Sequence, residues 1–193
     1  MKTPDEISIL SFKSPKAWAS WLDKNHAKSS GLWLKIAKKD SGLKSVSYPE
    51  ALETALCYGW IDGQKKSCDE FTWLQKFTPR GVKSIWSKIN REKALALIKT
   101  RGMKPAGLKA VENAKQNGQW DAAYDSQSTS TVPEDFQSEL KKNKKAKVFF
   151  ETLNSANRYA ILFRIHTARK AETRTRRIEE FVGMLARSEK IHP

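Results

Sequence analysis

A polar tract at residues 126–131, with the sequence SQSTST, divides this chain into two parts that differ in their secondary-structure patterns. Before the tract, runs of alternating apolar residues are mixed with helical patterns. After it, residues 132–193 show almost no strand character and predict two or three helices. We therefore expect an α+β domain over residues 1–125, and a helical segment over residues 126–193 that packs on it.

Three runs in the first part predict a small antiparallel sheet. Residues 32–39 (LWLKIAKK) alternate large apolar residues with others, as a half-buried strand does. Residues 60–66 and 70–77 are also strand-like, and the polar link Ser67–Asp69 between them indicates a hairpin. Because an isolated hairpin is marginally stable in water, we expect about three strands to form one sheet that packs with helices.

Helical patterns account for the rest of the first part. Ser14 and Ser47 are candidate N-caps, and Gly59 is expected to end the second helix. A third helix is expected to begin near Ser84, after the loop Thr78–Gly81. The apolar residues that recur with a helical period in this third helix are Ile85, Ile89 and Leu95. The four predicted helices span residues 14–26, 47–58, 82–102 and 107–118.

The composition favours an anionic partner. The formal net charge is +15, from 36 Lys and Arg against 21 Asp and Glu. The charge is spread evenly, at +4 in residues 1–80, +5 in residues 81–125 and +6 in residues 126–193, so the chain has no dedicated basic tail. An anionic small molecule is therefore expected to be a better partner than nucleic acid, and the protein partner stays open.

No segment predicts export, a membrane span or a cofactor. The start of the chain lacks the apolar run of a signal peptide, and no window is long and apolar enough to span a bilayer, so we expect a cytoplasmic protein. Cys57 and Cys68 lack metal-ligand spacing and are expected to be reduced. The three histidines, His26, His166 and His192, lie in separate contexts, and no metal cluster or nucleophilic triad is predicted.

Three blocks carry a resemblance to a known family. They are GWIDGQ at residues 59–64, FTPRGVKSIWSKIN at residues 77–90 and KAETRTRRIEE at residues 170–180. Together they resemble the YdeI/OmpD-associated family, whose members are sometimes labelled bacteriocin-protection proteins, over Trp33 to about Leu185. Gly81 departs from the pattern, since a basic residue is expected there. The resemblance implies a role in envelope stress and in resistance to cationic antimicrobial peptides, without implying a particular reaction.

The first block raises the question of what Asp62 does. A carboxylate in this position can act as a general acid or base, accept backbone N–H groups in a turn, or pair with Arg80. Asp69 and Glu70 are further acids near the predicted hairpin. A structural role for Asp62 is favoured over a catalytic one. The sequence therefore favours a protein without enzymatic activity and leaves an enzyme as the alternative.

The second and third blocks are basic. Arg80, Lys83, Ser84 and Ser87 surround a predicted helix start, where free N–H groups and the helix dipole attract an anion. The alternative for Ser84 is a purely structural role as the N-cap of this helix.

In the third block, Lys170, Arg174 and Arg177 share one helix face, and Glu172 pairs with Arg176. The alternatives for this face are a salt-bridged surface, or a role for Arg174 or Arg177 in reaching Asp62 or lining the same pocket.

Seven tryptophans are many for this length, and most are expected to be core residues. Trp60 and Trp86 also compete for a ligand role, because aromatic rings beside arginine suit stacking. The predicted ligand-binding residues are Trp60, Asp62, Arg80, Lys83, Ser84, Trp86, Ser87, Asn90, Lys170, Glu172, Arg174 and Arg177.

Three functional hypotheses follow from these observations. The leading one is a non-catalytic stress-protection protein that binds an anionic or phosphate-bearing ligand between Arg80, Lys83 and the face of residues 170–177. The alternatives are an enzyme of unknown chemistry that uses Asp62 as acid or base, and a nucleic-acid-binding protein.

Overall fold

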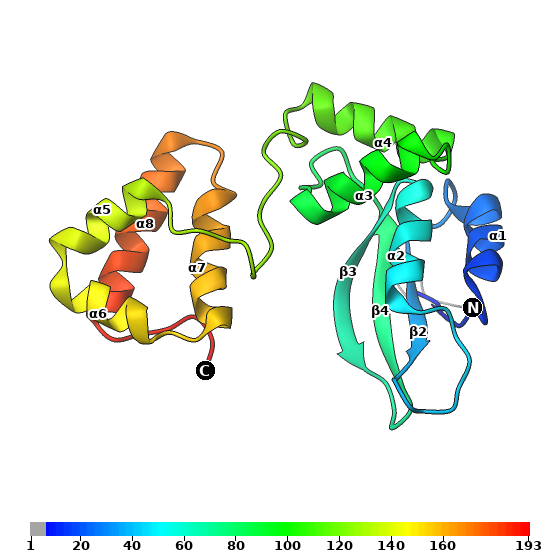
Figure 1. Ribbon diagram of the computed structural model, residues 1–193, viewed down its shortest axis with the longest axis horizontal. Coiled ribbons are helices and arrows are strands. Elements are labelled where there is room, and N and C mark those ends of the chain that lie inside the picture. Colours follow the sequence, from blue (N-terminus) through cyan, green and yellow to red (C-terminus); the bar gives the residue numbers. More distant parts are fainter. Residues whose placement is uncertain (1–6) are drawn as a thin grey trace. The chain divides into compact units, whose positions relative to one another are not determined.

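The computed structural model describes residues 7–193 and has the expected α+β architecture (Figure 1). The described residues form eight helices and one sheet of four strands, where about three strands had been predicted. The chain divides into two compact units. Unit 1 comprises the residues up to Ile85 together with Asn90–Asp121, and unit 2 comprises Trp86–Ile89 together with Ala122–Pro193. The main boundary lies near the polar tract. Trp86–Ile89, a short segment of the second block (residues 77–90), also belongs to unit 2.

Unit 1 contains the sheet, whose strand order is β1-β2-β4-β3. The first strand runs parallel to its neighbour, and the other two pairings are antiparallel. The two-residue β1 was missed because it is too short to show an alternating pattern. The elements that begin in this part of the chain are β1 (Ile9–Leu10), α1 (Pro15–Asn25), β2 (Leu32–Ala37), α2 (Tyr48–Cys57), β3 (Trp60–Ser67), β4 (Thr72–Pro79), α3 (Lys88–Lys99) and α4 (Pro105–Gln116).

The core of unit 1 forms where α1 and α2 pack on one face of the sheet. Trp18 of α1 is fully buried, with its ring centroid 5.8 Å from that of Phe77 in β4. Its indole N–H donates to the backbone oxygen of Ala51 in α2, at 3.1 Å. The buried residues of β2 on this face are Leu32, Leu34 and Ile36, as its alternating pattern predicted.

The helix boundaries in unit 1 follow from local capping. Ser14 accepts a hydrogen bond from the backbone N–H of Ala17, and Glu50 accepts one from the backbone N–H of Ser47. Both residues predicted as N-caps therefore occupy those positions. Gly59 has a left-handed φ of 71° after α2, and a Cβ there would lie 2.7 Å from the backbone oxygen of Ala106. Gly59 thus allows the chain to turn into β3 directly beside α4.

The predicted start of the third helix near Ser84 is wrong, because α3 begins at Lys88. The backbone oxygen of Trp86 accepts from the N–H of Tyr124, and the N–H of Lys88 donates to the oxygen of Tyr124, both at 2.9 Å. These bonds form an isolated parallel bridge at Ser87 and hold this segment out of the helix. The residues that recur with a helical period, Ile85, Ile89 and Leu95, are exposed, and α3 buries Asn90, Ala94 and Leu97 instead.

A β-bulge in β3 determines which face of the sheet each later residue occupies. Asp62 opposes Phe77, but the register shifts before Lys65, which opposes Gln75. The extra residue lies at Gly63–Gln64, and the side-chain amide of Gln75 donates to both of their backbone oxygens, at 2.9 and 3.2 Å. Gln75 is 3% exposed. A buried amide therefore holds the bulge in place.

Unit 2 is a helical cluster with its own core. Four helices form where two or three had been predicted, because asparagine caps divide the segment. Asn143 and Asn154 each accept a hydrogen bond from the backbone N–H three residues on, at 3.1 and 2.9 Å. The helices are α5 (Glu134–Lys142), α6 (Lys144–Thr152), α7 (Ser155–His166) and α8 (Ala171–Ala186). The largest fully buried side chains of its core are Phe136, Ile161, Ile165 and Leu185.

Replacing Gln75 tests the importance of the bulge. We expect Gln75→Met, which is similar in size but cannot hydrogen-bond, to lower the free energy of unfolding of unit 1 by about 1–3 kcal/mol. Six of the seven tryptophans lie in unit 1, so urea denaturation followed by tryptophan fluorescence reports on it. Gln64→Ala, at an exposed position of the same bulge, is the control and should change stability by less than about 0.5 kcal/mol. Equal stability of Gln75→Met and wild type would contradict this role.

Candidate functional site

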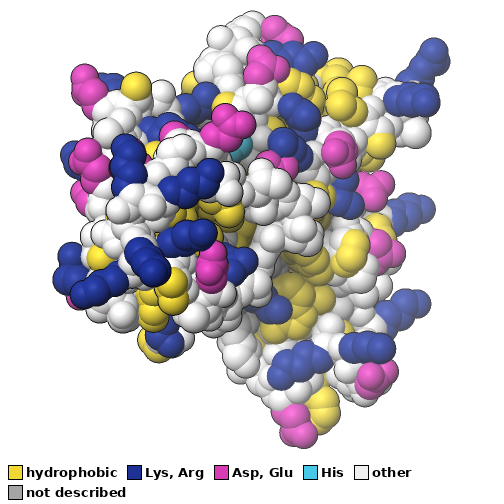
Figure 2. Space-filling model, turned by 60° about the vertical axis from the view of Figure 1, so that its left-hand side comes forward, with side chains coloured by type: hydrophobic (Ala, Val, Ile, Leu, Met, Phe, Trp, Pro, Cys, Tyr) yellow, Lys and Arg dark blue, Asp and Glu magenta, His cyan; other side chains and the backbone are white. Residues whose placement is uncertain are grey.

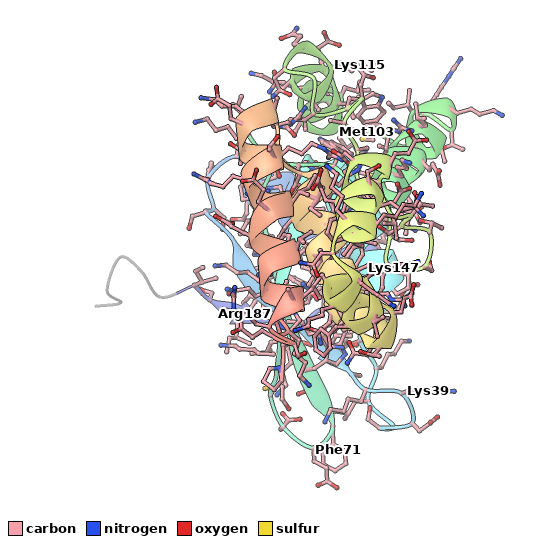
Figure 3. The ribbon with its side chains drawn as sticks, turned by 90° about the vertical axis from the view of Figure 1, so that its left-hand side faces the viewer. Lys39, Phe71, Met103, Lys115, Lys147 and Arg187 are labelled. Atoms are coloured by element: carbon pink, nitrogen blue, oxygen red, sulfur yellow. The ribbon has the colours of Figure 1, made fainter. Side chains whose placement is uncertain are left out.

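A cleft of about 600 Å³ lies at one end of the sheet in unit 1. The loop after β2 and the strands β3 and β4 form it. In Figure 3, Lys39 and Phe71 mark this end of unit 1, and Lys39 points away from the ribbon. The residues that line this lysine cleft are Lys38, Lys39, Lys65, Lys66, Ser67 and Trp73.

Backbone hydrogen bonds position the lysines of the cleft. Lys38 follows β2 directly, and its N–H donates to the backbone oxygen of Phe71 at 2.8 Å, which fastens the loop to the hairpin. Its ammonium donates to the backbone oxygen of Asp69 at 2.9 Å. Lys65 and Lys66 follow the bulge in β3 and oppose Gln75 and Leu74, which are both buried. The lysines therefore project from a fixed backbone.

Two tryptophan rings hold two of these ammonium groups. The Nζ atom of Lys65 lies 4.5 Å from the ring centroid of Trp73, and the Nζ atom of Lys66 lies 4.2 Å from that of Trp33. Tyr48 contacts the Trp73 ring, at 5.9 Å between centroids. A cation–π contact at an exposed site contributes only about 0.5–1 kcal/mol, so it orients the lysine without preventing it from binding an anion.

The cleft has an excess of positive charge. None of its six lining residues is acidic, and no ion pair within 4.0 Å involves its four lysines in the part of the chain that the structure describes. The nearby carboxylate of Asp69 accepts from the Thr72 hydroxyl at 2.7 Å and pairs with Lys35 at 3.0 Å. These contacts, the Thr72 hydrogen bond first, hold the pKa of Asp69 well below its ordinary value. The charge of Asp69 is thus directed to Lys35 rather than to the cleft.

The lysine cleft was missed at the level of sequence, although a signal was present. Two Lys-Lys pairs, at residues 38–39 and 65–66, each end a strand-like run, and both runs are close to tryptophans once the strands pair. Each pair alone is typical of a solvated surface. Only the cross-strand register brings the two pairs together.

The first sequence block forms part of the core of unit 1. Trp60 is 1% exposed, donates its indole N–H to the backbone oxygen of His26 at 3.1 Å, and packs edge-on against Trp18. This burial favours the core role for Trp60. Asp62 is half-buried, and its carboxylate accepts from the Tyr48 hydroxyl at 2.8 Å. The tyrosine fastens the start of α2 to β3, which is consistent with a structural role for Asp62.

The second block forms a turn that Arg80 bridges. The Arg80 guanidinium donates to the backbone oxygen of Ile85 at 3.1 Å, and the backbone N–H of Arg80 donates to the backbone oxygen of Gly59 at 2.9 Å. Ser84 closes a turn by donating its N–H to the oxygen of Gly81. Because the helix begins only at Lys88, Ser84 is not at a helix N-terminus. Of the remaining predicted residues, Trp86 and Asn90 are buried, Ser87 is half-buried and Lys83 is exposed.

The third block stabilises unit 2. The Arg174 guanidinium donates to both carboxylate oxygens of Asp135, at 2.5 and 2.8 Å, and to the backbone oxygen of Ile165 at 3.0 Å. Arg177 donates to the backbone oxygen of Arg164. Two arginines therefore cap the C-terminal carbonyl groups of α7, and one of them also joins the start of α5. Lys170 and Glu172, at the start of α8, are exposed.

Arg174 also lines a cavity of about 220 Å³ within unit 2, whose walls include the rings of Tyr124, Tyr159 and Phe163. The guanidinium already binds a carboxylate and a backbone oxygen, so this cavity offers aromatic surface more than available charge. The predicted approach of Arg174 or Arg177 to Asp62 remains a prediction, since the contacts described for each of these side chains lie within its own unit.

The fold and the site define a two-unit α+β protein with a basic, tryptophan-containing cleft. Residues 10–110 match the family model described as "Domain of unknown function (DUF8412)", and residues 129–188 match the one described as "Bacteriocin-protection, YdeI or OmpD-Associated". The first model covers more than half of the chain, so the chain belongs to that family, and its helical C-terminal part is similar to the YdeI/OmpD-associated family. No curated protein and no solved structure matches it.

The two matches divide the three sequence blocks. Blocks 59–64 and 77–90 lie in the region of the first family model, and only block 170–180 lies in the YdeI/OmpD-associated region. The lysine cleft also lies in the first region. Among the described residues, no helix is both long and apolar enough to cross a membrane.

Replacing Arg174 tests the structural role of the third block. We expect Arg174→Ala to destabilise unit 2 by about 1–2 kcal/mol, in the lower part of the range for charged hydrogen bonds because the Asp135 side chain is 46% exposed. Hydrogen exchange of the α7 amides measures this loss. The control is Arg176→Ala, whose pair with Glu180 is long and exposed and should contribute less than about 0.5 kcal/mol.

The effect of Arg174→Ala should also depend on pH. Hydrogen bonds from Arg174, the largest influence, lower the pKa of Asp135 in the folded state. The stabilisation is therefore complete above the ordinary aspartate pKa of about 3.9, and it is lost as the pH falls through the lower folded-state value. The stability difference between wild type and Arg174→Ala should shrink between pH 7 and pH 3. A difference that stays constant over this range would show that the ion pair does not cause it.

Proposed function

We propose that this chain is a non-catalytic, cytoplasmic stress-protection protein that acts by binding an anionic, phosphate-bearing ligand in the lysine cleft. The description of the YdeI/OmpD-associated family supports the protective role. The observation that carries the binding role is the convergence of four lysines around Trp73, with no acidic residue in the lining. Neither half of this proposal requires a chemical reaction.

The chemistry of the cleft favours a ligand with several negative charges. Lysine ammonium groups are strongly hydrated point charges that suit phosphate oxygens, and four of them can neutralise more than one phosphate group. The Trp73 ring adds a face on which a planar group can stack. A phosphate ester that carries a planar group would use both features, whereas a simple carboxylate would use few of them.

The basic residues predicted from the second block, in unit 1, and from the third block, in unit 2, are the alternatives for binding the same kind of ligand. Arg80 and Lys83 border the turn after β4, and Lys170 lies at the start of α8. The lysine cleft is favoured because Arg174 and Arg177 already bind oxygen atoms of unit 2. Matched variants separate the two locations.

Removing two lysines from opposite walls of the cleft tests the proposal. We expect pyrophosphate and ATP, used as probes, to raise the melting temperature of wild type. The double variant Lys38→Ala/Lys65→Ala should lose about 2 kcal/mol of binding free energy, or roughly 30-fold in Kd by isothermal titration calorimetry, since each lost charged contact contributes about 1 kcal/mol or more. Lys141→Ala/Lys145→Ala, two exposed lysines of unit 2, is the matched control and should bind normally.

Arg80→Ala provides the comparison between locations. If binding survives in Arg80→Ala and is lost in the cleft variant, the lysine cleft is the site. If Arg80→Ala alone abolishes binding, the ligand binds at the turn of the second block and the cleft proposal fails. The proposed function as a whole fails if neither probe binds wild type at low salt, where attraction between charges is strongest.

A further inference from the structure

The lysine cleft continues on to the second face of the sheet. In antiparallel strands, directly opposed residues share a face, so Trp73 lies on the same face as Ile36 and Ser67. Trp33 lies three positions before Ile36 in β2, and because side chains alternate along a strand, it lies on the other face. Lys66 lines the cleft at Trp73, yet its Nζ atom lies 4.2 Å from the Trp33 ring centroid. This one lysine therefore connects the two faces.

The second face has a pattern of cations around Trp33. Lys66, Leu74 and Lys35 form one row across β3, β4 and β2, and Lys76 directly opposes Trp33 in the adjacent position. Leu74, at the centre of the row, is buried. Lys66 is exposed, and Lys35, Lys76 and Trp33 are half-buried. Strands are about 4.8 Å apart, so the row spans roughly 10 Å. The result is a half-buried aromatic ring bordered by lysines, of which Lys35 also pairs with Asp69 at 3.0 Å.

The strand that carries Lys65 and Lys66, β3, lies at the edge of the sheet. Among the described strands of the order β1-β2-β4-β3, only β4 pairs with β3, and Lys65 and Lys66 extend from opposite faces of β3 near its end. An extended ligand can therefore pass around this edge from one tryptophan to the other. A small ligand bound at one ring cannot contact the second ring on the opposite face.

We propose that the phosphate-bearing ligand is a single-stranded nucleic acid that passes around the end of β3, with its phosphates at the lysines and its bases stacked on Trp73 and Trp33. This inference rests on the proposed function and names the class of ligand. Proteins that bind single strands without sequence preference combine a basic groove with aromatic side chains in this way.

The energies of the two kinds of contact allow a base to replace a lysine ammonium on a tryptophan ring. Stacking of one base on an aromatic ring contributes about 1–3 kcal/mol, compared with about 0.5–1 kcal/mol for an exposed cation–π contact. A base can therefore displace the ammonium of Lys65 or Lys66 from its ring, and the displaced ammonium remains within reach of the adjoining phosphate. Base pairing hides the faces of the bases in a duplex, so a duplex gains only the phosphate contacts.

The length of the ligand provides the first test. Fluorescence anisotropy of the full chain should show that labelled oligothymidylates of about 4, 8 and 16 nucleotides bind with increasing affinity, and that the longer strands bind more tightly than ATP. A duplex of equal length should bind less tightly at equal salt, and binding should weaken steeply as salt is added. Quenching of tryptophan fluorescence should accompany binding of the single strand.

Trp33→Ala separates this inference from the proposed function. It should weaken binding of the longest oligonucleotide by about 5- to 150-fold, corresponding to 1–3 kcal/mol of lost stacking, while ATP and pyrophosphate bind the cleft as in wild type. Lys66→Ala is a second variant at an exposed position and should weaken oligonucleotide binding even if Trp33→Ala impairs folding. Lys141→Ala/Lys145→Ala remains the control.

Three outcomes would overturn the inference while the proposed function stands. In the first, oligonucleotides of every length bind no more tightly than ATP. In the second, the duplex binds as tightly as the single strand. In the third, vesicles of phosphatidylserine and phosphatidylcholine compete better than the oligonucleotide, which would indicate a lipid surface as the ligand. Failure of pyrophosphate, ATP and oligonucleotides alike would overturn both proposals.

Discussion

The hydrogen bonds from the buried amide of Gln75 to the bulge in β3 determine the chemistry of the sheet end in unit 1. A change of one residue in register moves every later side chain of a strand to the opposite face. The bulge makes such a change between Asp62 and Lys65, so Lys65 faces Trp73 and Lys66 faces Trp33. Without it, the two lysines would exchange faces, and Asp62 would no longer share a face with Lys65. One polar side chain thus controls the distribution of charge around two aromatic rings.

Polar contacts also fix the structure of unit 2, but there they use the positive charge of the arginines instead of leaving it available to a ligand. Arg174 and Arg177 bind the last carbonyl groups of α7, and Arg174 also neutralises Asp135. Their positive charge is used within the unit, although the sequence block that contains them looks like the strongest cationic motif. Within residues 7–193, the Lys-Lys pairs of unit 1 form no ion pair within 4.0 Å. The distinction between structural and available charge therefore comes from the contacts of each cation and not from the density of basic residues.

The sequence predicted the features that depend on local interactions. The caps at Ser14 and Ser47 and the alternating pattern of β2 lie where they were expected. The start of α3 was misplaced because the bridge with Tyr124, almost 40 residues away, holds Trp86 and Ser87 out of the helix. The bulge was missed for the same kind of reason, since Gly63 resembles an ordinary turn residue until Gln75 is placed opposite to it. Both errors come from contacts between distant residues that no local pattern contains.

The same limit explains why the total charge of +15 identified a class of partner but not a site. Lysines and arginines are spread over the visible surface with acidic side chains among them, as Figure 2 shows. Such a field attracts anions from every direction and raises the rate of encounter, but it holds none of them in one orientation. Lys142, for example, pairs with Glu139 at 2.6 Å on an exposed helix surface. A binding site requires cations without nearby acids, and a rigid surface that fixes their spacing. The end of the sheet supplies both, because the tryptophan rings and the bulge hold Lys65 and Lys66, and Asp69 of the adjoining hairpin already pairs with Lys35.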